Sequence, residues 1–483
     1  MTRINTNLPS IMGALYMNRN MKALNVALER MATGIRINSA KDDPDGIIVT
    51  DVLRGELTGI QSAINNAERA NNLMATAEGA AASVAELLLD IKAVVHEAAS
   101  QGDLTEAEIQ SKQNQIDNDI QAIDKIIASA TFAGQNLLDG SLGYQTSGVD
   151  GAVITDLAIN KAPVGAASGE IPVAAELLVQ AERGSLIFPN AAIAGDVSVS
   201  FSGLEGSQKL DFNTGTSSTE LALAINSTTE NTGLMAELVN GDPLQGVRIM
   251  TADYGSAATV RVEVMAGNPA DFALQDELGA PAEADTGVDI ELNINGSTVV
   301  GRGLQCHYAS ASLDMEMFID EAWNAAGPPA STNFEIVSGG ALFQIGPQIG
   351  AQQQDSIGIR PLDSTHLGRS ALGYLGDLTS GAALSLQSGE MTSMIAVVDE
   401  GIQQVADIRA RIGAFQNNTL GMTVDSLQQA YENISLARSS ILDADYAEET
   451  AAMVRQQILT EATQAAMTMA HRVPQQVLGL LID

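Results

Sequence analysis

The sequence predicts a multi-domain protein in which both termini form an all-α core of helical-bundle or coiled-coil type around a central α+β, β-rich insert. Two periodicities indicate this: apolar residues recur every three or four positions near both ends, and they alternate with polar residues in the middle. The charge follows the same division. Of a net charge of −35 over 483 residues, residues 1–145 and 386–483 hold −7 each, and residues 146–385 hold −21.

The composition disfavours several functional classes. Acidic residues number 59 against 24 basic ones, which argues against a nucleic-acid surface and against docking onto anionic lipid. The one cysteine, Cys306, rules out an intrachain disulfide and a multi-Cys zinc site, and four scattered histidines disfavour a His-based metal cluster. No uncharged apolar run is long enough for a transmembrane helix. We expect the protein to bind no metal, cofactor, nucleic acid or membrane, and we expect it not to be an enzyme.

The N-terminal flank divides into a terminal helix over residues 1–44 and core helices with a hairpin over residues 45–145. Turn residues around Asp43, Pro44 and Gly46 separate the two parts. Further helices are expected from about residue 47 to 100 and from 105 to 130, and a loop or hairpin over 131–143. The terminal helix carries an apolar stripe at helical spacing, formed by Leu8, Ile11, Leu15, Leu24, Leu28 and Ile35.

The C-terminal flank mirrors this arrangement. We expect core helices within residues 386–442, over 389–415 and 424–442, and a terminal helix within residues 443–483. The terminal helix has its own stripe of Val454, Ile458, Ala465, Met469, Leu478, Leu480 and Leu481. A lone amphipathic helix cannot hide such a face, so the two stripes need each other or copies of themselves. Periodicity alone leaves two alternatives open: self-assembly or an ordinary intramolecular bundle.

The middle, residues 146–385, predicts a different kind of fold. Alternating segments and one short helix form an α+β module over about residues 195–266. A second part covers 286–385, with a strand over 288–294 that ends in the hairpin signal Asn295-Gly296, a helix over 313–326, and strands over 333–345. Cys306 is expected to be a buried structural thiol rather than a nucleophile.

Two segments match only the beginning of a metal-binding motif. His96-Glu97 begins a zinc-protease pattern but lacks the second histidine. Asp42, Asp43 and Asp45 resemble the start of a calcium loop, which Pro44 and the absence of a distal Glu defeat. We therefore predict no catalytic and no metal-ligating residues.

Short motifs at both ends closely resemble those of bacterial flagellins. The N-terminal ones are Met31-Ala-Thr-Gly-Ile-Arg-Ile-Asn-Ser-Ala-Lys-Asp-Asp43 and Thr131-Phe-Ala-Gly-Gln-Asn-Leu-Leu-Asp-Gly140, and the C-terminal ones are Arg411-Ile-Gly-Ala-Phe-Gln-Asn417 and Ile441-Leu-Asp-Ala-Asp-Tyr-Ala-Glu-Glu449. They occur in the right order and span about half the chain. The signature residues they contain are Arg36, Asn38, Ser39, Asp42, Asp43, Phe132, Gly134, Arg411, Gly413, Asn417, Asp443 and Asp445.

The resemblance implies a structural subunit that polymerises with copies of itself into the flagellar filament for swimming. Hook–filament junction proteins share parts of these motifs and are the alternative. The terminal helices would pack in the inner tube and the centre would face outward, with an export chaperone, cap and junction proteins as further partners. We expect extracellular localisation in the filament. Because no apolar segment follows the single Arg of the first ten residues, we also expect export without a cleaved signal peptide.

The sequence also differs from many flagellins at two positions. Flagellins that the vertebrate innate receptor recognises have an Arg, and a Glu three residues later, at positions that correspond here to Asp90 and Ala93. An acid in place of a receptor-paired cation is repulsive. We therefore expect weak recognition by that receptor.

Overall fold

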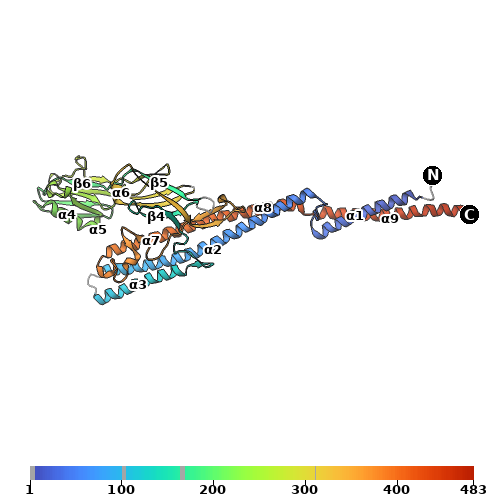
Figure 1. Ribbon diagram of the computed structural model, residues 1–483, viewed down its shortest axis with the longest axis horizontal. Coiled ribbons are helices and arrows are strands. Elements are labelled where there is room, and N and C mark those ends of the chain that lie inside the picture. Colours follow the sequence, from blue (N-terminus) through green and yellow to red (C-terminus); the bar gives the residue numbers. More distant parts are fainter. Residues whose placement is uncertain (1–5, 101–104, 164–168, 311, 483) are drawn as a thin grey trace. The chain divides into compact units, whose positions relative to one another are not determined.

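A computed structural model describes residues 6–100, 105–163, 169–310 and 312–482, and leaves the side chains of residues 351 and 473–482 undescribed. The chain divides into two compact units (Figure 1). The first consists of Met1–Arg69, Ile345–Ile349 and Leu420–Asp483, and the second of Ala70–Gln344 and Gly350–Thr419. Each is described by itself. Within the described parts of the chain, none of the helices has both the length and the apolar character needed to cross a membrane.

Long helices form both ends of the chain, as the periodicity predicts. They are α1 (Leu8–Thr33), α2 (Pro44–Ser100), α3 (Glu106–Ser129), α7 (Met391–Ala414), α8 (Met422–Leu442) and α9 (Tyr446–Ile482), with a π-helical stretch, η7 (Phe415–Gly421), between α7 and α8. One prediction is wrong: Ile35 is not part of the helical stripe. α1 ends at Thr33 because Gly34 adopts a left-handed conformation (φ 71°) that caps it.

The second unit contains a helical core formed by the C-terminal part of α2 together with α3 and α7. Each helix turns one apolar stripe inward, and the fully buried side chains include Met74, Leu88, Ile91, Ile116, Ile123, Val397 and Val405. Buried Gln113 on α3 donates to the carbonyl oxygen of Leu378 (2.8 Å) and accepts from the amide of Leu386 (2.8 Å). These bonds fasten the segment before α7 to the helices.

Asp119 on α3 is an unfavourable element of this core. Its Oδ2 atom is buried without a hydrogen-bond partner. Burial, and next the charge of Asp90 on α2, raise the pKa of Asp119. The native fold therefore binds this proton more tightly than the unfolded chain does. Ionisation of Asp119 therefore lowers the stability of the fold. This penalty is absent at pH below the ordinary carboxyl pKa and becomes complete as the pH rises through the raised pKa of Asp119.

We expect Asp119→Asn to stabilise the helical core at pH 7. The gain should be about 0.5 kcal/mol, since the residue is partly exposed and water screens its charge. It should shrink as the pH falls towards 4, which urea unfolding at pH 7 and pH 4 would measure. Asp124→Asn on the same helix is the matched control. Asp124 accepts from the amide and hydroxyl of Ser364 (2.9 Å each), so its loss should destabilise. A gain that is equal at both pH values would contradict the assignment.

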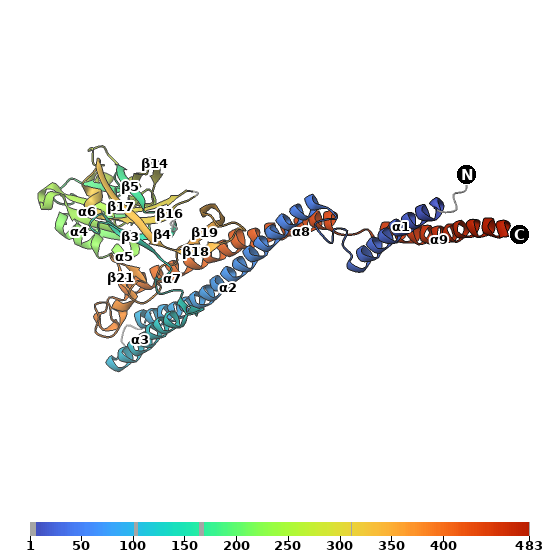
Figure 2. The same cartoon turned by 45° about the vertical axis from the view of Figure 1, so that its right-hand side comes forward.

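The central region is built of antiparallel sheets, labelled in part in Figure 2. The strand orders are β14-β13-β5-β17-β3, β15-β16-β4, β12-β11-β7-β8 and β6-β10-β9, with three hairpins, β1-β2, β18-β19 and β20-β21. The strands are β1 (Thr131–Phe132), β2 (Gln135–Asn136), β3 (Tyr144–Ser147), β4 (Ile154–Lys161), β5 (Ile171–Val179), β6 (Ser185–Phe188), β7 (Val197–Ser202), β8 (Ser207–Phe212), β9 (Leu234–Leu238), β10 (Val247–Thr251), β11 (Thr259–Ala266), β12 (Ala284–Thr286), β13 (Glu291–Ile294), β14 (Ser297–Val300), β15 (Gln305–Ala309), β16 (Asp314–Ile319), β17 (Ala330–Gly339), β18 (Ala341–Gln344), β19 (Gln354–Ile357), β20 (Gly368–Arg369) and β21 (Gly373–Tyr374).

Short helices join the strands. The α-helical ones are α4 (Ser218–Asn226), α5 (Thr229–Thr232) and α6 (Glu321–Ala325), and the 3-10 turns are η1 (Val239–Gly241), η2 (Pro243–Gln245), η3 (Pro269–Phe272), η4 (Ala351–Gln353), η5 (Leu375–Leu378) and η6 (Leu386–Ser388). The helix expected over residues 313–326 is wrong in its first half, which is strand β16. Met315, Met317 and Ile319 are buried at every second position, and this period of two belongs to a strand.

Two apolar cores hold the central region together. The first gathers side chains from the five-stranded sheet and from β15-β16-β4, and it includes Cys306, whose thiol pKa burial raises to about 11. The second lies among the other two large sheets and α4, and it contains Phe188, Phe201, Phe212 and Phe272. The module expected over about residues 195–266 therefore extends further at both ends, because its sheets include β6, before residue 195, and β12, after residue 266. Cys306 is thus the buried thiol that the sequence predicts.

Candidate assembly interface

In the first unit, α1 and α9 pack side by side and antiparallel (Figures 1 and 2). The less exposed residues of each helix follow a spacing of three and four, the repeat of a coiled-coil seam. We call these two rows the seam: Ser10, Gly13, Met17, Asn20, Leu24, Ala27 and Met31 on α1, and Glu449, Met453, Gln456, Thr460, Thr463, Met467 and Ala470 on α9. The coiled-coil-like pairing of the termini therefore exists within one chain.

The seam is built largely from small and polar residues. A Cβ at Gly13 would lie 2.6 Å from Cγ of Met467, so glycine allows the helices to approach closely there. Asn20 donates to the hydroxyl of Thr463 at 3.2 Å. Arg30, beside the seam, pairs with Glu449 at 3.0 Å. Polar partners at set positions favour this register of the two helices over a slipped one.

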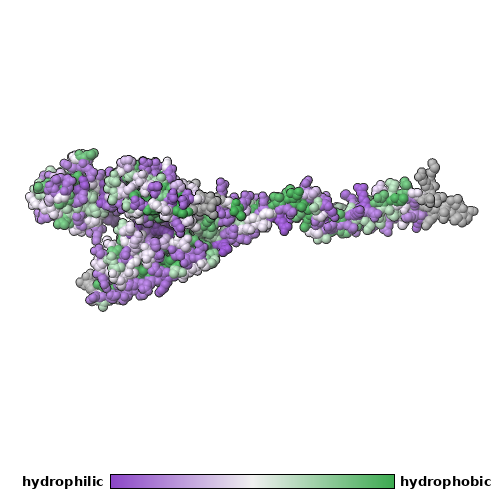
Figure 3. Space-filling view, viewed as in Figure 1, coloured by the Kyte–Doolittle hydropathy of each residue, from purple (hydrophilic) through white to green (hydrophobic). Residues whose placement is uncertain are grey.

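Large apolar side chains are left on the outside of the pair. Of the predicted stripe residues, Leu8, Ile11, Leu15, Leu28, Val454, Ile458, Ala465 and Met469 are all exposed, Leu15 to 66% and Met469 to 70%, whereas Leu24 is half-buried in the seam. We call this surface, with Met12, Tyr16 and Met21, the outer face. Figure 3 shows apolar patches among polar ones on the part of the molecule that contains α1 and α9. The side chains of Leu478, Leu480 and Leu481 lie outside the described part of α9.

The segments that follow α1 and α8 are fastened to each other. Ile35 forms an isolated β-bridge with Asp443. The amide of Arg36 donates to the carbonyl oxygen of Leu442 and its guanidinium donates to that of Ile441, both at 2.7 Å. Arg36 therefore ties the two chain segments together just before α9 begins.

Four polar residues shape the adjoining turns. Asp42 accepts from the amide and hydroxyl of Ser39 (2.9 Å each), and the side-chain hydrogen bond from Ser39 lowers the pKa of Asp42. Asp43 accepts from the amide of Gly46 in the first turn of α2 (2.9 Å), and Asn38 donates to the carbonyl oxygen of Ile35 (3.0 Å). Asp445 accepts from the amide of Ala447 (2.8 Å) at the start of α9. These carboxylates are helix caps and turn formers.

Comparisons with known proteins agree with this arrangement of helical ends. Residues 4–142 match the family model described as the bacterial flagellin N-terminal helical region, and residues 395–481 match the bacterial flagellin C-terminal helical region. The chain is 26% identical to flagellin A of Helicobacter pylori and 26% identical to B-type flagellin of Pseudomonas aeruginosa, in each case over 99% of both chains.

The chain belongs to the bacterial flagellin family. The crystal structure of the flagellar junction protein of Legionella pneumophila is also similar, at 13% identity and a TM-score of 0.28, covering 82% of this chain and all of that one. A likeness this low carries no argument for the junction-protein alternative.

The remaining flagellin motif residues lie in the second unit. Phe132 and Gly134 belong to the β1-β2 hairpin, which Gly134 turns with φ 85°. Arg411 lies on α7, and burial, followed by the charge of Arg360, lowers the pKa of its guanidinium. Gly413 has open space beside it, and Asn417 is exposed in η7. The motifs thus fall into two sets, one at the α1–α2 and α8–α9 turns of the first unit and one on the β1-β2 hairpin, α7 and η7 of the second.

The seam is what sequence reasoning missed. We assigned mutual packing to the larger apolar residues and passed over Gly13, Asn20 and Thr463. The signal was present as the unbroken repeat of three and four on α9, in which five of the seven positions are small or polar. Among the residues that the structure describes, no group of three His, Cys, Asp or Glu side chains is placed to hold a metal ion.

Proposed function

We propose that this flagellin-family chain polymerises into the filament of the bacterial flagellum through the outer face of α1 and α9. The observation that carries the proposal is the difference in residue composition between the seam and the outer face of the helix pair. The contact within the chain is made largely by small and polar residues, together with Leu24 and four methionines, and most of the large apolar residues stay exposed. Exposed apolar stripes of this extent mark surfaces that bind another protein.

The filament would then have three layers. Residues 1–44 and 443–483 form the inner tube, residues 45–145 and 386–442 surround it, and residues 146–385 face outward. The concentration of acidic charge in residues 146–385, −21 of −35, suits an outer surface that keeps filaments soluble and apart. The role is mechanical, since the filament transmits the torque of the motor, and no enzymatic step is proposed.

Electron microscopy of the purified protein after addition of salt tests the proposal. Salt screens the repulsion between highly acidic subunits, so the outer faces can associate. We expect filaments of uniform width that lengthen with time. Short capped pieces that stop growing would favour a junction protein, and particles that stay monomeric would argue against polymerisation altogether.

We further propose that the chain reaches the filament tip through the flagellar export route, which needs no cleaved signal. A chaperone would cover the apolar residues of α9 before export, and the cap and junction proteins of the flagellum would contact the assembled subunits. The exposed side chains of Val454, Ile458 and Met469 support the need for such cover.

Recognition by the vertebrate innate flagellin receptor is expected to be weak. Asp90 and Ala93 are exposed on α2 and stand where receptor-recognised flagellins carry Arg and Glu. In a reporter-cell assay, the purified monomer should give little response, and Asp90→Arg with Ala93→Glu should increase it by about tenfold or more, since a rim charge acts on association. Exposed Asn114→Asp on α3 serves as the control. A full response from the unmodified monomer would contradict the expectation.

A further inference from the structure

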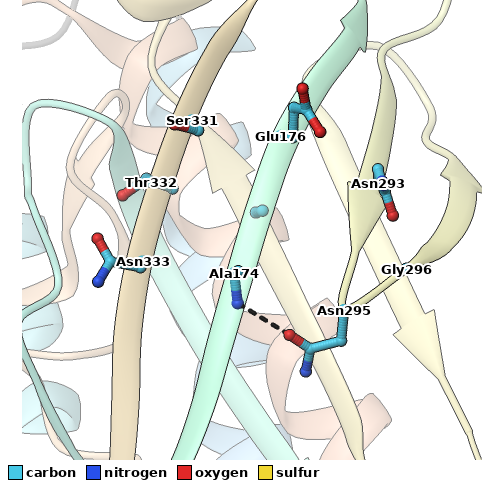
Figure 4. A pocket seen from close by; sticks show the side chains of 9 residues that line it. Ala174, Glu176, Asn293, Asn295, Gly296, Ser331, Thr332 and Asn333 are labelled. Carbon is cyan, nitrogen blue, oxygen red and sulfur yellow. Dashed lines mark hydrogen bonds between the residues drawn. The ribbon is translucent and has the colours of Figure 1, made fainter.

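A shallow hollow lies on the outward face of the five-stranded sheet in the central region. Its volume is about 460 Å³, and it spans β13, β5 and β17 (Figure 4). The register places Ser331, Glu176 and Asn293 in one row across the three strands. Asn333, Ala174 and Asn295 form the next row. We call these six residues the polar platform.

The platform is preorganised. Ala174 forms a floor because its small side chain is surrounded by longer polar ones. Asn295 is held in place, since its Oδ1 atom accepts from the amide of Ala174 at 2.9 Å, the bond drawn in Figure 4. The Glu176 side chain extends from β5 towards the strand that carries Asn293 (Figure 4). A ligand would therefore meet a sheet backbone and an Asn295 side chain that are already in place, which lowers the entropic cost of binding.

One atom of the platform lacks a partner. Oδ1 of Asn293 is buried and accepts no hydrogen bond. A buried acceptor without a donor is costly in a folded protein and is rare. A ligand hydroxyl that donates a hydrogen bond to this atom, once the half-buried Asn293 side chain turns it towards the hollow, would supply the missing bond.

The chemistry of the lining narrows the class of ligand. It includes one carboxylate, that of Glu176, and no Lys or Arg, so it does not suit an anion or a nucleic acid. A single carboxylate is too few for an all-protein calcium site. The apolar part is limited to alanine, which excludes a lipid or an aromatic ligand. Strand addition needs a free sheet edge, but β5 is paired on both sides.

We propose that the polar platform binds a neutral, hydroxyl-rich saccharide. Amides of Asn293 and Asn333 both donate and accept, the hydroxyl of Ser331 does the same, and Glu176 accepts from two neighbouring hydroxyls. Vicinal sugar hydroxyls match this set. The volume lies within the range of ordinary ligand pockets. A saccharide that carries carboxylates is repelled by Glu176.

The test uses the full-length monomer titrated in a calorimeter with maltotriose, mannotriose and chitotriose as neutral probes and trigalacturonate as the acidic one. We expect saturable binding of at least one neutral trisaccharide and none of trigalacturonate. Ala174→Leu fills the floor, and Glu176→Gln removes the acceptor charge without changing shape. Each should weaken binding at least tenfold, or about 1.4 kcal/mol.

Glu335→Gln is the matched control, because Glu335 is exposed on the same sheet but does not line the hollow. It should bind as the unmodified chain does. The proposal is overturned if no neutral probe saturates up to about 10 mM, if trigalacturonate binds equally well, or if Ala174→Leu and Glu176→Gln both bind normally. Because Glu176→Gln is isosteric and lies on an exposed position, it keeps the test valid should Ala174→Leu misfold.

Discussion

Replacing Ile11 and Leu15 by Asp is expected to abolish filament formation while leaving the monomer folded. Both side chains are exposed on the outer face of α1, at 52% and 66%, so the substitutions leave the residues of the seam unchanged. In a filament, each would be buried against a neighbouring subunit. Burial of one such side chain contributes about 1.5–3 kcal/mol, and a buried unpaired carboxylate costs more.

Two such losses raise the critical concentration for polymerisation by at least about 100-fold. Sedimentation and electron microscopy after addition of salt would measure this, and circular dichroism would check that helix content is unchanged. Asn18→Asp adds a charge at an exposed polar position of the same helix and is the control. If the double variant polymerised at the usual concentration, the outer face would not be the assembly surface.

The long helices were the part of the fold that the sequence predicted best. Their apolar spacing persists over many turns, and the turn residues around Pro44 mark where α2 begins. Ile35 fits the spacing but lies beyond the cap of α1. The spacing of apolar residues does not show that Gly34, in a left-handed conformation, ends the helix before it. The stretch 313–319 was misassigned for the opposite reason. Its methionines suit either period, and only the neighbouring strands β15 and β4 decide between them.

The proposed assembly surface is made of residues that the sequence already singles out, but the sequence does not say what those residues face. Hydrophobicity identified Leu8, Ile11 and Leu15, yet it could not say whether they faced α9 or a neighbouring subunit. The deciding residues are small or polar ones such as Gly13 and Thr463, which hydropathy places on a solvent face. The polar platform was invisible in the sequence for a related reason. Its members come from three strands that are paired only through long-range register.

Phe272→Ala is expected to destabilise the second central core by about 3–5 kcal/mol, the usual cost of emptying a phenylalanine site. Phe272 is 3% exposed and stacks on Phe188 with ring centroids 4.9 Å apart. It also meets the edge of Phe201 at 6.1 Å. Its removal takes away a ring that contacts Phe188, Phe201 and Phe212 and leaves a cavity among them. Limited proteolysis should then cut first within residues 185–286.

The same variant separates the central region from assembly. α1 and α9 belong to the other compact unit, so Phe272→Ala should still form filaments of normal length. Leu278→Ala, at a 95% exposed position of the same module, should change stability by less than about 0.5 kcal/mol and is the control. Loss of filaments in Phe272→Ala, with helix content preserved, would mean that the central core also contributes to the contacts between subunits. Retained filaments with a protease-sensitive centre would locate those contacts in the terminal helices.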